Sequence, residues 1–302
     1  MSGSGPNFVW VNGEVLPADG PHLPVTDRGF QLGDGIFETL RAKGGRCTEL
    51  PEHVARLRRS AAGLAFELPE GVDAVLADGI ARLLAAEHLD GPGADASVRI
   101  TVSRGVWASR GLLPPRDVHL VPTIVVQAWP VEPPPAGHLE HGIALVASRI
   151  RRDPQNPIVT LKTTSRADYV YARIEARAAG ADDALFLTTA GHLSESTTAN
   201  VFLLRTAPDG VLELATPALD CAILPGTTRS WLLRWAASVG LRPFEGPLTP
   251  DELATADEAF LSSSVAGILP VTRFNGHPIG PGVPGPWTRR ARADREAVFG
   301  RG

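Results

Sequence analysis

The chain has 302 residues, of which 43% are hydrophobic and 21% are charged, as in ordinary globular proteins. That length allows one large domain or two domains of ordinary size. The net charge of −4 argues against a nucleic-acid partner, because a phosphate backbone attracts basic surfaces.

The first predicted domain, residues 1–128, mixes strands and helices. Alternating apolar residues around Asn12-Gly13 predict a hairpin, and a second hairpin is expected to turn at Gly44-Gly45. Apolar residues at helical spacing predict one helix from about Glu52 and another over about 73–88. Two strands are expected to follow, over 97–105 and 119–129.

The stretch "WPVEPPPAG" at 129–137 is expected to be a stiff linker, because proline neither continues a helix nor donates to a strand ladder. A second domain, residues 138–302, then begins with a strand over 142–148. Helices are predicted over 167–180 and 230–240, two strands over 183–204, and one strand over 258–271 that runs into a serine-rich corner. The predicted fold class is therefore α/β (α+β) with two domains.

Targeting and metal-binding signals are missing from the sequence. The N-terminus has neither the basic nor the apolar region of a signal peptide, and no apolar run is long enough for a membrane span. Cys47 and Cys221 are far apart, and no Cys or His pair has metal-ligand spacing. The expectation is a cytoplasmic, reduced protein without a membrane partner or a metal site.

Lysine is rare in this chain. Of 29 Lys and Arg residues only Lys43 and Lys162 are lysines; Lys43 lies in a polar turn, and Lys162 follows the apolar run "IVTL". A buried lysine, unlike arginine, can lose its proton and act as a nucleophile. Lys162 is therefore either a strand-end lysine that reaches solvent or a lysine that forms a Schiff base with a cofactor such as pyridoxal phosphate. The second interpretation requires an acid for the pyridine nitrogen and a phosphate site at a helix start.

Both requirements have candidates in the second half. "SESTTANVF" places Glu195 beside three hydroxyl residues, although a glutamate in a surface turn is the alternative. "ILPGTTRSWLL" offers Gly226 for close backbone approach, and Thr227 and Thr228 for hydroxyl and N–H groups at the helix start. Simple capping of the helix by a threonine is the alternative there. The serines of "LSSSV" could close the phosphate site from another side.

Five motifs in order resemble those of the class IV aminotransferases: "LPEHVARL", "LKTTS", "ESTTANVF", "LPGTTR" and "FLSSSVAGILPV". The resemblance runs from about residue 8 to residue 292. It implies the fold type IV of pyridoxal-phosphate enzymes, with a smaller N-terminal α/β domain and a larger C-terminal domain whose strands form a pseudo-barrel. The family includes branched-chain, D-amino-acid and (R)-selective amine transaminases and aminodeoxychorismate lyases.

The resemblance also implies roles for individual residues. Lys162 matches the Schiff-base lysine, Glu195 the acid on the pyridine nitrogen, Arg56 the phosphate arginine, and Leu224 the apolar residue against the ring. The cofactor-binding set is Arg56, Lys162, Glu195, Thr197, Thr198, Leu224, Gly226, Thr227, Thr228, Ser263 and Ser264. The substrate-binding set is Phe37, Arg99, Arg110, Ser264 and Val265.

Several features bear on the branch of the family. The run "DRGFQLGDG" is similar to the D-amino-acid enzymes and to the lyases. Glu38 is an acid, as in the transaminases, where a compared lyase has threonine, and Phe37 looks like the branched-chain branch. The loop "SRGVWASRGLLP" offers Arg110 for a substrate carboxylate, but Leu112 stands where the D-amino-acid branch has histidine. Arg99 matches a pocket arginine of the branched-chain branch, and a structural ion pair is the alternative for either arginine.

The sequence thus favours an aminotransferase that uses pyridoxal 5'-phosphate, an amino acid of the D type and a 2-oxo acid. The Asn-Pro before the lysine is found in lyases, so 4-amino-4-deoxychorismate lyase is the first alternative, followed by branched-chain and (R)-amine transaminases. A Rossmann dehydrogenase would require a third glycine after "GDG", and a serine hydrolase would require G-x-S-x-G. A binding protein on an inherited scaffold would be expected to lack Lys162 or Glu195. The resemblance implies a homodimer.

Overall fold

The computed structural model describes residues 5–135 and 137–300, which form two compact units. The N-terminal unit contains the chain up to Glu132, together with Leu161–Ser165 and the C-terminal residues from Val298. The C-terminal unit contains Pro133–Thr160 and Arg166–Ala297. The main boundary, between Glu132 and Pro133, lies within the predicted linker 129–137, but the five residues around Lys162 and the residues from Val298 belong to the N-terminal unit.

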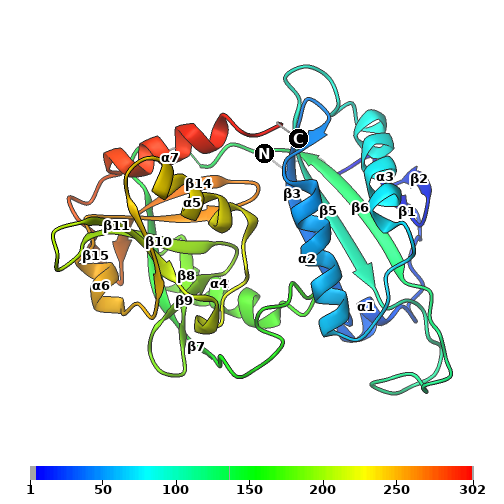
Figure 1. Ribbon diagram of the computed structural model, residues 1–302. Coiled ribbons are helices and arrows are strands. Elements are labelled where there is room, and N and C mark those ends of the chain that lie inside the picture. The colour runs from blue at the N-terminus through cyan, green and yellow to red at the C-terminus, as the bar shows by residue number, and fades with distance from the viewer. Residues whose placement is uncertain (1–4, 136, 301–302) are drawn as a thin grey trace. The chain divides into compact units, whose positions relative to one another are not determined.

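The N-terminal unit is built on an antiparallel sheet with the strand order β2-β1-β6-β5-β3-β4 (Figure 1). The predicted hairpins are present, and the first turns at Asn12 and Gly13, which both have positive φ. β6 continues to Pro130, inside the stretch predicted to be linker. The strands are β1 (Phe8–Val11), β2 (Glu14–Pro17), β3 (Gly35–Lys43), β4 (Arg46–Cys47), β5 (Asp95–Ser103) and β6 (Thr123–Pro130).

Two helices, α2 (Leu50–Gly63) and α3 (Val72–Ala86), cover one face of this sheet and form its core with it. A short helix, α1 (Arg28–Leu32), precedes β3. Ile36 and Leu40 of β3 are fully buried in the core. Because side chains alternate along a strand, Glu38 faces the helices, whereas Phe37 lies on the opposite face of the sheet.

The C-terminal unit contains six strands that close on themselves, since β9 pairs with both β8 and β10. This ring follows the order β10-β13-β14-β7-β8-β9 and has an apolar interior. Its strands are β7 (Ile143–Arg152), β8 (Asp183–Thr188), β9 (Leu193–Ser196), β10 (Asn200–Thr206), β13 (Glu258–Ser263) and β14 (Gly267–Phe274). Three further strands extend it: β11 (Leu212–Pro217), β12 (Arg242–Gly246) and β15 (His277–Pro278). The predicted pseudo-barrel is therefore confirmed.

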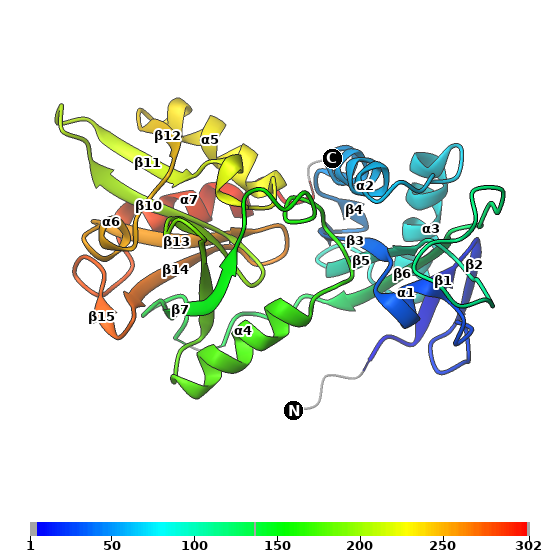
Figure 2. The ribbon, with the colours of Figure 1, turned by 90° about the horizontal axis from the view of Figure 1, so that it is seen from below.

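The helices of the C-terminal unit pack outside the closed strands. α4 (Ala167–Ala178) lies beside β7 and β8, as Figure 2 shows for β7. α5 (Thr227–Ser238) and α7 (Pro286–Glu296) bury apolar residues against β10 and β13. A short α6 (Pro250–Ala254) and a 3₁₀ turn, Leu219–Cys221, complete the unit. Among the described residues, no helix combines the length and the apolar character needed to span a bilayer.

Two segments differ from their predicted form. Residues 183–204 were expected to give two strands but form three, because the chain turns both before and after the four-residue β9. Residues 258–271 were expected to give one strand but form β13 and β14, which pair antiparallel across the serine-rich corner. These extra turns place Glu195 within β9 and Ser264 in the turn after β13.

Candidate functional site

Lys162 lies on a short segment that adds to the start of β3. Its carbonyl oxygen accepts a hydrogen bond from the N–H of Phe37 at 2.9 Å, and its N–H donates to Ser60 Oγ at 3.2 Å. The Thr164 N–H donates to the Gly35 carbonyl at 2.9 Å. The backbone around this half-buried lysine is therefore fixed by the sheet and by α2.

The side chain of Phe37 brings two cationic residues together. The Lys162 Nζ lies 4.6 Å from the centroid of its ring, and the Arg99 Cζ lies 4.0 Å from it. Arg99 Nε also donates to Thr101 Oγ1 at 3.2 Å on the same strand. The negative face of an aromatic ring attracts both kinds of cation. The structure thus gathers three predicted site residues on the sheet face that α2 and α3 leave open.

Arg56 takes part in a buried ion pair that the sequence did not predict. It donates from Nε to Glu38 Oε1 at 2.7 Å and from Nη2 to Glu38 Oε2 at 2.6 Å. His53 Nδ1 lies 2.7 Å from the same Oε2. Arg56 is 3% exposed, and Glu38 and His53 are fully buried. Glu38, predicted only as a marker of the branch, therefore orients the arginine assigned to the phosphate.

Opposing effects act on the acidity of Glu38. Burial by itself raises the pKa, but the hydrogen bonds and positive charge of Arg56, with those of His53, lower it to about 2. The carboxylate therefore stays ionised through the whole neutral range.

Glu195 is a buried carboxylate in β9 with a defined set of partners. Its Oε2 accepts from the Leu224 N–H at 2.9 Å and from Asn200 Nδ2 at 3.4 Å. Its Oε1 accepts from the Tyr169 hydroxyl at 3.4 Å and lies 3.6 Å from Arg152 Nη2. Burial, followed by the negative charge of Glu195, raises the pKa of Tyr169 to about 12, so this hydroxyl keeps its proton and donates. The carboxylate of Glu195 could therefore accept a hydrogen bond from a protonated pyridine nitrogen.

At the start of α5, the side chain of Asn200 lies close to the backbone of Gly226. Gly226 caps the helix, and a Cβ there would lie 2.2 Å from Asn200 Oδ1, so only glycine fits without displacement. Asn200 in turn donates to the Leu224 carbonyl at 3.0 Å. The Glu195 site and the helix start therefore share one asparagine.

Hydroxyl groups and a buried arginine surround that helix start. Thr227 Oγ1 lies 3.2 Å from Ser264 Oγ. Arg295, which is 1% exposed, donates from Nη2 to Thr228 Oγ1 at 3.2 Å. Ser262 Oγ is buried and has no hydrogen-bond partner among the residues that the structure describes. Backbone N–H groups, hydroxyls and positive charge at a helix N-terminus are the donor set that an anionic phosphate requires.

Other predicted site residues are placed differently. Thr197 Oγ1 donates to Asp183 Oδ1 at 2.6 Å, which occupies the hydroxyl proton, and Thr198 is exposed. Ser263 Oγ accepts from the Ala266 N–H at 3.3 Å. Arg110 is exposed on the loop after β5. The Thr197 carbonyl accepts from Arg166 Nη2 at 2.6 Å, and the roles of these residues in binding cofactor or substrate remain predictions.

The chain is similar to known proteins over almost its whole length. The profile of the family "Amino-transferase class IV" matches residues 35–274. A Methanocaldococcus jannaschii protein named as a branched-chain-amino-acid aminotransferase is 35% identical, with 90% of this chain and 89% of that protein covered. A D-alanine aminotransferase of Bacillus licheniformis is 29% identical, with 94% of each chain covered.

Solved structures share the fold. A branched-chain amino acid aminotransferase from T.th., solved with pyridoxamine 5'-phosphate, matches with a TM-score of 0.87 and 27% identity over 99% of this chain and 96% of that one. A Legionella pneumophila structure named as a 4-amino-4-deoxychorismate lyase matches with a TM-score of 0.81 and 27% identity over 93% and 97%. The chain therefore belongs to the class IV aminotransferases, enzymes of fold type IV that use pyridoxal 5'-phosphate.

Proposed function

We propose that this chain is a transaminase that moves an amino group between an amino acid and a 2-oxo acid, and that it works as a homodimer. The observation that carries the proposal is that Lys162 and Arg99 both reach the ring of Phe37. The lysine amine could bond the aldehyde carbon of the cofactor, and a guanidinium can bind a substrate carboxylate through two parallel hydrogen bonds. In both substrates the carbon that reacts is bonded directly to the carboxylate: it carries the amino group in the amino acid and the oxo group in the 2-oxo acid.

The described residues fit the cofactor of the family. The start of α5, with Thr227, Thr228 and Ser264, would hold the phosphate, and Glu195 would pair with the pyridine nitrogen. When bound, pyridoxal phosphate supplies an electron-withdrawing ring that stabilises negative charge at the substrate Cα. Lys162 would hold the cofactor through Nζ and then carry the proton that leaves the substrate Cα.

Among amino acids we infer that a branched-chain one is the first candidate. Arg99, which resembles the pocket arginine of that branch, lies at Phe37, whereas Arg110 is exposed and Leu112 is 80% exposed. The Methanocaldococcus jannaschii relative carries the same activity in its name. A D-amino acid, which the sequence favours, is the second candidate because of the run "DRGFQLGDG" and the similarity to the Bacillus licheniformis enzyme.

The lyase reaction is supported by fewer features. Asn-Pro precedes the lysine segment, and the Legionella pneumophila structure shares the fold. Glu38 supports a transaminase on the family resemblance, in which a lyase has threonine at this position; a threonine could not form the ion pair with Arg56. Single-turnover bleaching of the cofactor with L-leucine, D-alanine, D-glutamate and (R)-1-phenylethylamine distinguishes the transaminases. Formation of 4-aminobenzoate from aminodeoxychorismate, without bleaching by any amine, would instead establish the lyase.

Replacing Arg99 by leucine is expected to weaken amino-acid binding. A charge-assisted hydrogen bond to a carboxylate contributes about 1.5–3 kcal/mol, so KM for the amino acid should rise about 10- to 100-fold. Steady-state kinetics with L-leucine and 2-oxoglutarate measure the change. Arg110→Leu is the matched control: if it raises KM while Arg99→Leu does not, the loop arginine binds the carboxylate and the D-amino-acid assignment gains.

Replacing Gly226 by alanine is expected to weaken cofactor binding. The added Cβ would force Asn200 away, and crowding of this kind costs about 1–3 kcal/mol, equal to a rise of about 5- to 150-fold in Kd. Titration of the apoprotein with pyridoxal 5'-phosphate, followed by absorbance, measures Kd. Gly210→Ala in a surface turn of the same unit, where nothing lies within 4 Å of the added Cβ, should leave Kd unchanged. Equal Kd values for both variants would show that the start of α5 does not hold the phosphate.

A further inference from the structure

The segment Leu161–Ser165, which carries Lys162, is held by α2 at its start. The side chain of Leu161 lies directly over Gly63, where a Cβ would come within 2.7 Å of it. The Lys162 N–H donates to Ser60 Oγ, about one helical turn before Gly63, at 3.2 Å. These contacts fix the first two residues of the segment, so its far end needs other partners.

Two hydroxyl groups hold the far end of the segment. Thr164 Oγ1 donates to the Gly33 carbonyl at 2.8 Å, and Ser165 Oγ donates to the same carbonyl at 3.1 Å. The Thr164 N–H donates to the Gly35 carbonyl at 2.9 Å. Glycine permits this close approach, because a Cβ on Gly33 would lie 2.6 Å from Ser165 Oγ. Lys162 therefore lies between two anchored ends.

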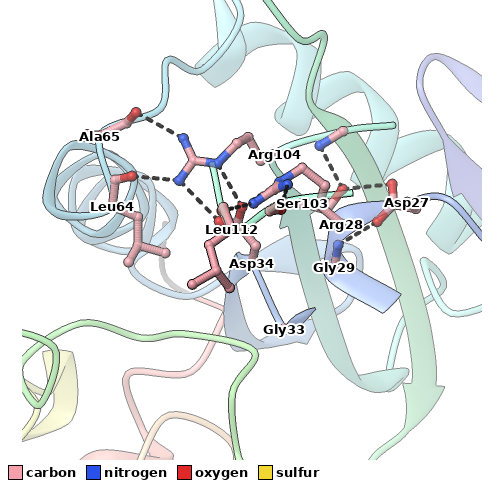
Figure 3. Close-up of polar contacts among 12 residues, drawn as sticks. Asp27, Arg28, Gly29, Gly33, Asp34, Leu64, Ala65, Ser103, Arg104 and Leu112 are labelled. Atoms are coloured by element: carbon pink, nitrogen blue, oxygen red, sulfur yellow. Dashed lines mark hydrogen bonds and ion pairs between the residues drawn. The ribbon is translucent and has the colours of Figure 1, made fainter. Parts of the chain in front are cut away.

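The turn that receives these hydroxyls is itself held by Asp34, which stands between the two glycines. Its Oδ2 accepts from Arg28 Nε at 2.7 Å and from Arg104 Nε at 2.8 Å (Figure 3). Arg104 also donates to two carbonyls at the end of α2, those of Leu64 at 2.7 Å and Ala65 at 2.9 Å. One carboxylate thus joins this turn to the end of α2, and the lysine segment is bound to both.

We propose that Thr164 and Ser165 are positioning residues, whose hydroxyls fix the backbone of Lys162 so that its amine reaches the cofactor in one place. The part played by Lys162 in this inference rests on the proposed function. A lysine side chain is long and flexible, so the backbone must supply the order that its amine requires. A shift of about 1 Å between two reacting groups is enough to slow their bonding strongly.

The double variant Thr164→Val, Ser165→Ala tests the fixation in the full-length protein. It removes both hydroxyls but keeps the backbone N–H bond from residue 164 to the Gly35 carbonyl. Hydrogen exchange of the amides at positions 162 and 164 should become about fivefold faster, the size expected for the loss of a net hydrogen bond. Exchange followed by mass spectrometry of the peptide that contains Lys162 measures the change.

Two forms of the cofactor separate positioning of the lysine from general damage to the fold. Pyridoxal phosphate has an aldehyde whose carbon the Lys162 amine can bond, with the aldehyde oxygen leaving as water, whereas pyridoxamine phosphate has an amine there and cannot react. Both forms carry the same phosphate and pyridine nitrogen. The double variant should therefore raise Kd for pyridoxal phosphate about fivefold and leave Kd for pyridoxamine phosphate unchanged. Absorbance titration of the full-length apoprotein measures both constants.

A matched control comes from the residue between Lys162 and Thr164. Thr163 is 8% exposed, but its hydroxyl takes part in none of the bonds that hold the segment. Thr163→Val therefore makes the same change of hydroxyl to methyl directly beside the lysine. It should leave both the exchange of the segment and the two Kd values unchanged.

Each outcome is decisive. Unchanged exchange in the double variant would overturn the fixation by the two hydroxyls, and faster exchange with an unchanged Kd for pyridoxal phosphate would overturn the link to Lys162. An equal rise of both Kd values, or the same changes in Thr163→Val, would also overturn the proposal, because a general loosening would explain them. If Lys162→Ala binds pyridoxal phosphate as tightly as the wild type, the proposed role of Lys162 fails. The exchange rates then still decide whether Thr164 and Ser165 fix the segment.

Discussion

Lys162→Ala is expected to be a colourless protein with a transaminase rate lower by about 10³-fold, the usual contribution of a positioned acid–base group. The reason is that Lys162 Nζ, at the ring of Phe37, is the amine proposed to hold the cofactor and to carry the substrate proton. Absorbance of the purified protein and single-turnover rates with L-leucine measure both effects.

The scarcity of lysine makes the control simple. Only Lys43 offers another side-chain amine, so Lys43→Ala should keep both colour and rate. Borohydride should attach the pyridoxyl group to the peptide that contains Lys162. Label on Lys43, or a yellow Lys162→Ala protein, would exclude the assignment.

Glu38→Gln is expected to lower the free energy of unfolding at pH 7 by about 3 kcal/mol, because it leaves the buried charge of Arg56 without its counter-charge. The pKa of Glu38 gives a similar magnitude. A fall from 4.5 to about 2 corresponds to about 3 kcal/mol, at about 1.36 kcal/mol for each pH unit. Urea unfolding of both proteins measures the difference.

The pH dependence of that difference has a definite sign. A carboxyl with a lowered pKa in the folded state stabilises the fold fully above its unfolded pKa, here 4.5, and this stabilisation is lost as the pH falls towards 2. The gap between wild type and Glu38→Gln should therefore be constant from about pH 5 to 8 and should narrow below 4.5. Asp209→Asn, which removes an exposed partner of Arg242, should change stability little at any pH. A gap that does not narrow in acid would contradict the role assigned to the Glu38 charge.

Local patterns were sufficient for most of the fold. Asn12 and Gly13 adopt the positive φ of the predicted turn, and α2, α3, α4 and α5 begin within about three residues of their predicted positions. The strand count of 183–204 was wrong because β9, "LSES", has a single large apolar residue among four. It forms a strand through pairing with β8 and β10, and such tertiary pairing has no signal in the local sequence.

The candidate site could be predicted only in part for a similar reason. Lys162, Glu195 and Gly226 stand in motifs that are recognisable within a few residues. The partners of these residues cannot be recognised in the same way, because an ion pair depends on which strands and helices meet. Arg152 is 43 positions from Glu195 and Tyr169 is 26 positions from it, and the three residues lie on different elements, β7, α4 and β9, so no local pattern links them.

The proline-rich stretch joins the two units in sequence, yet the chain does not divide there into two self-contained fragments. A fragment ending at Glu132 would lack Leu161–Ser165 and would keep β3 without this partner. The N–H of Phe37 and the carbonyl of Gly35 would then be unpaired at an open strand edge, the kind of edge that recruits other chains into aggregates. The segment with the proposed catalytic lysine therefore also pairs with the exposed edge of β3. A fragment without this segment would lose the proposed catalytic lysine and would be expected to aggregate.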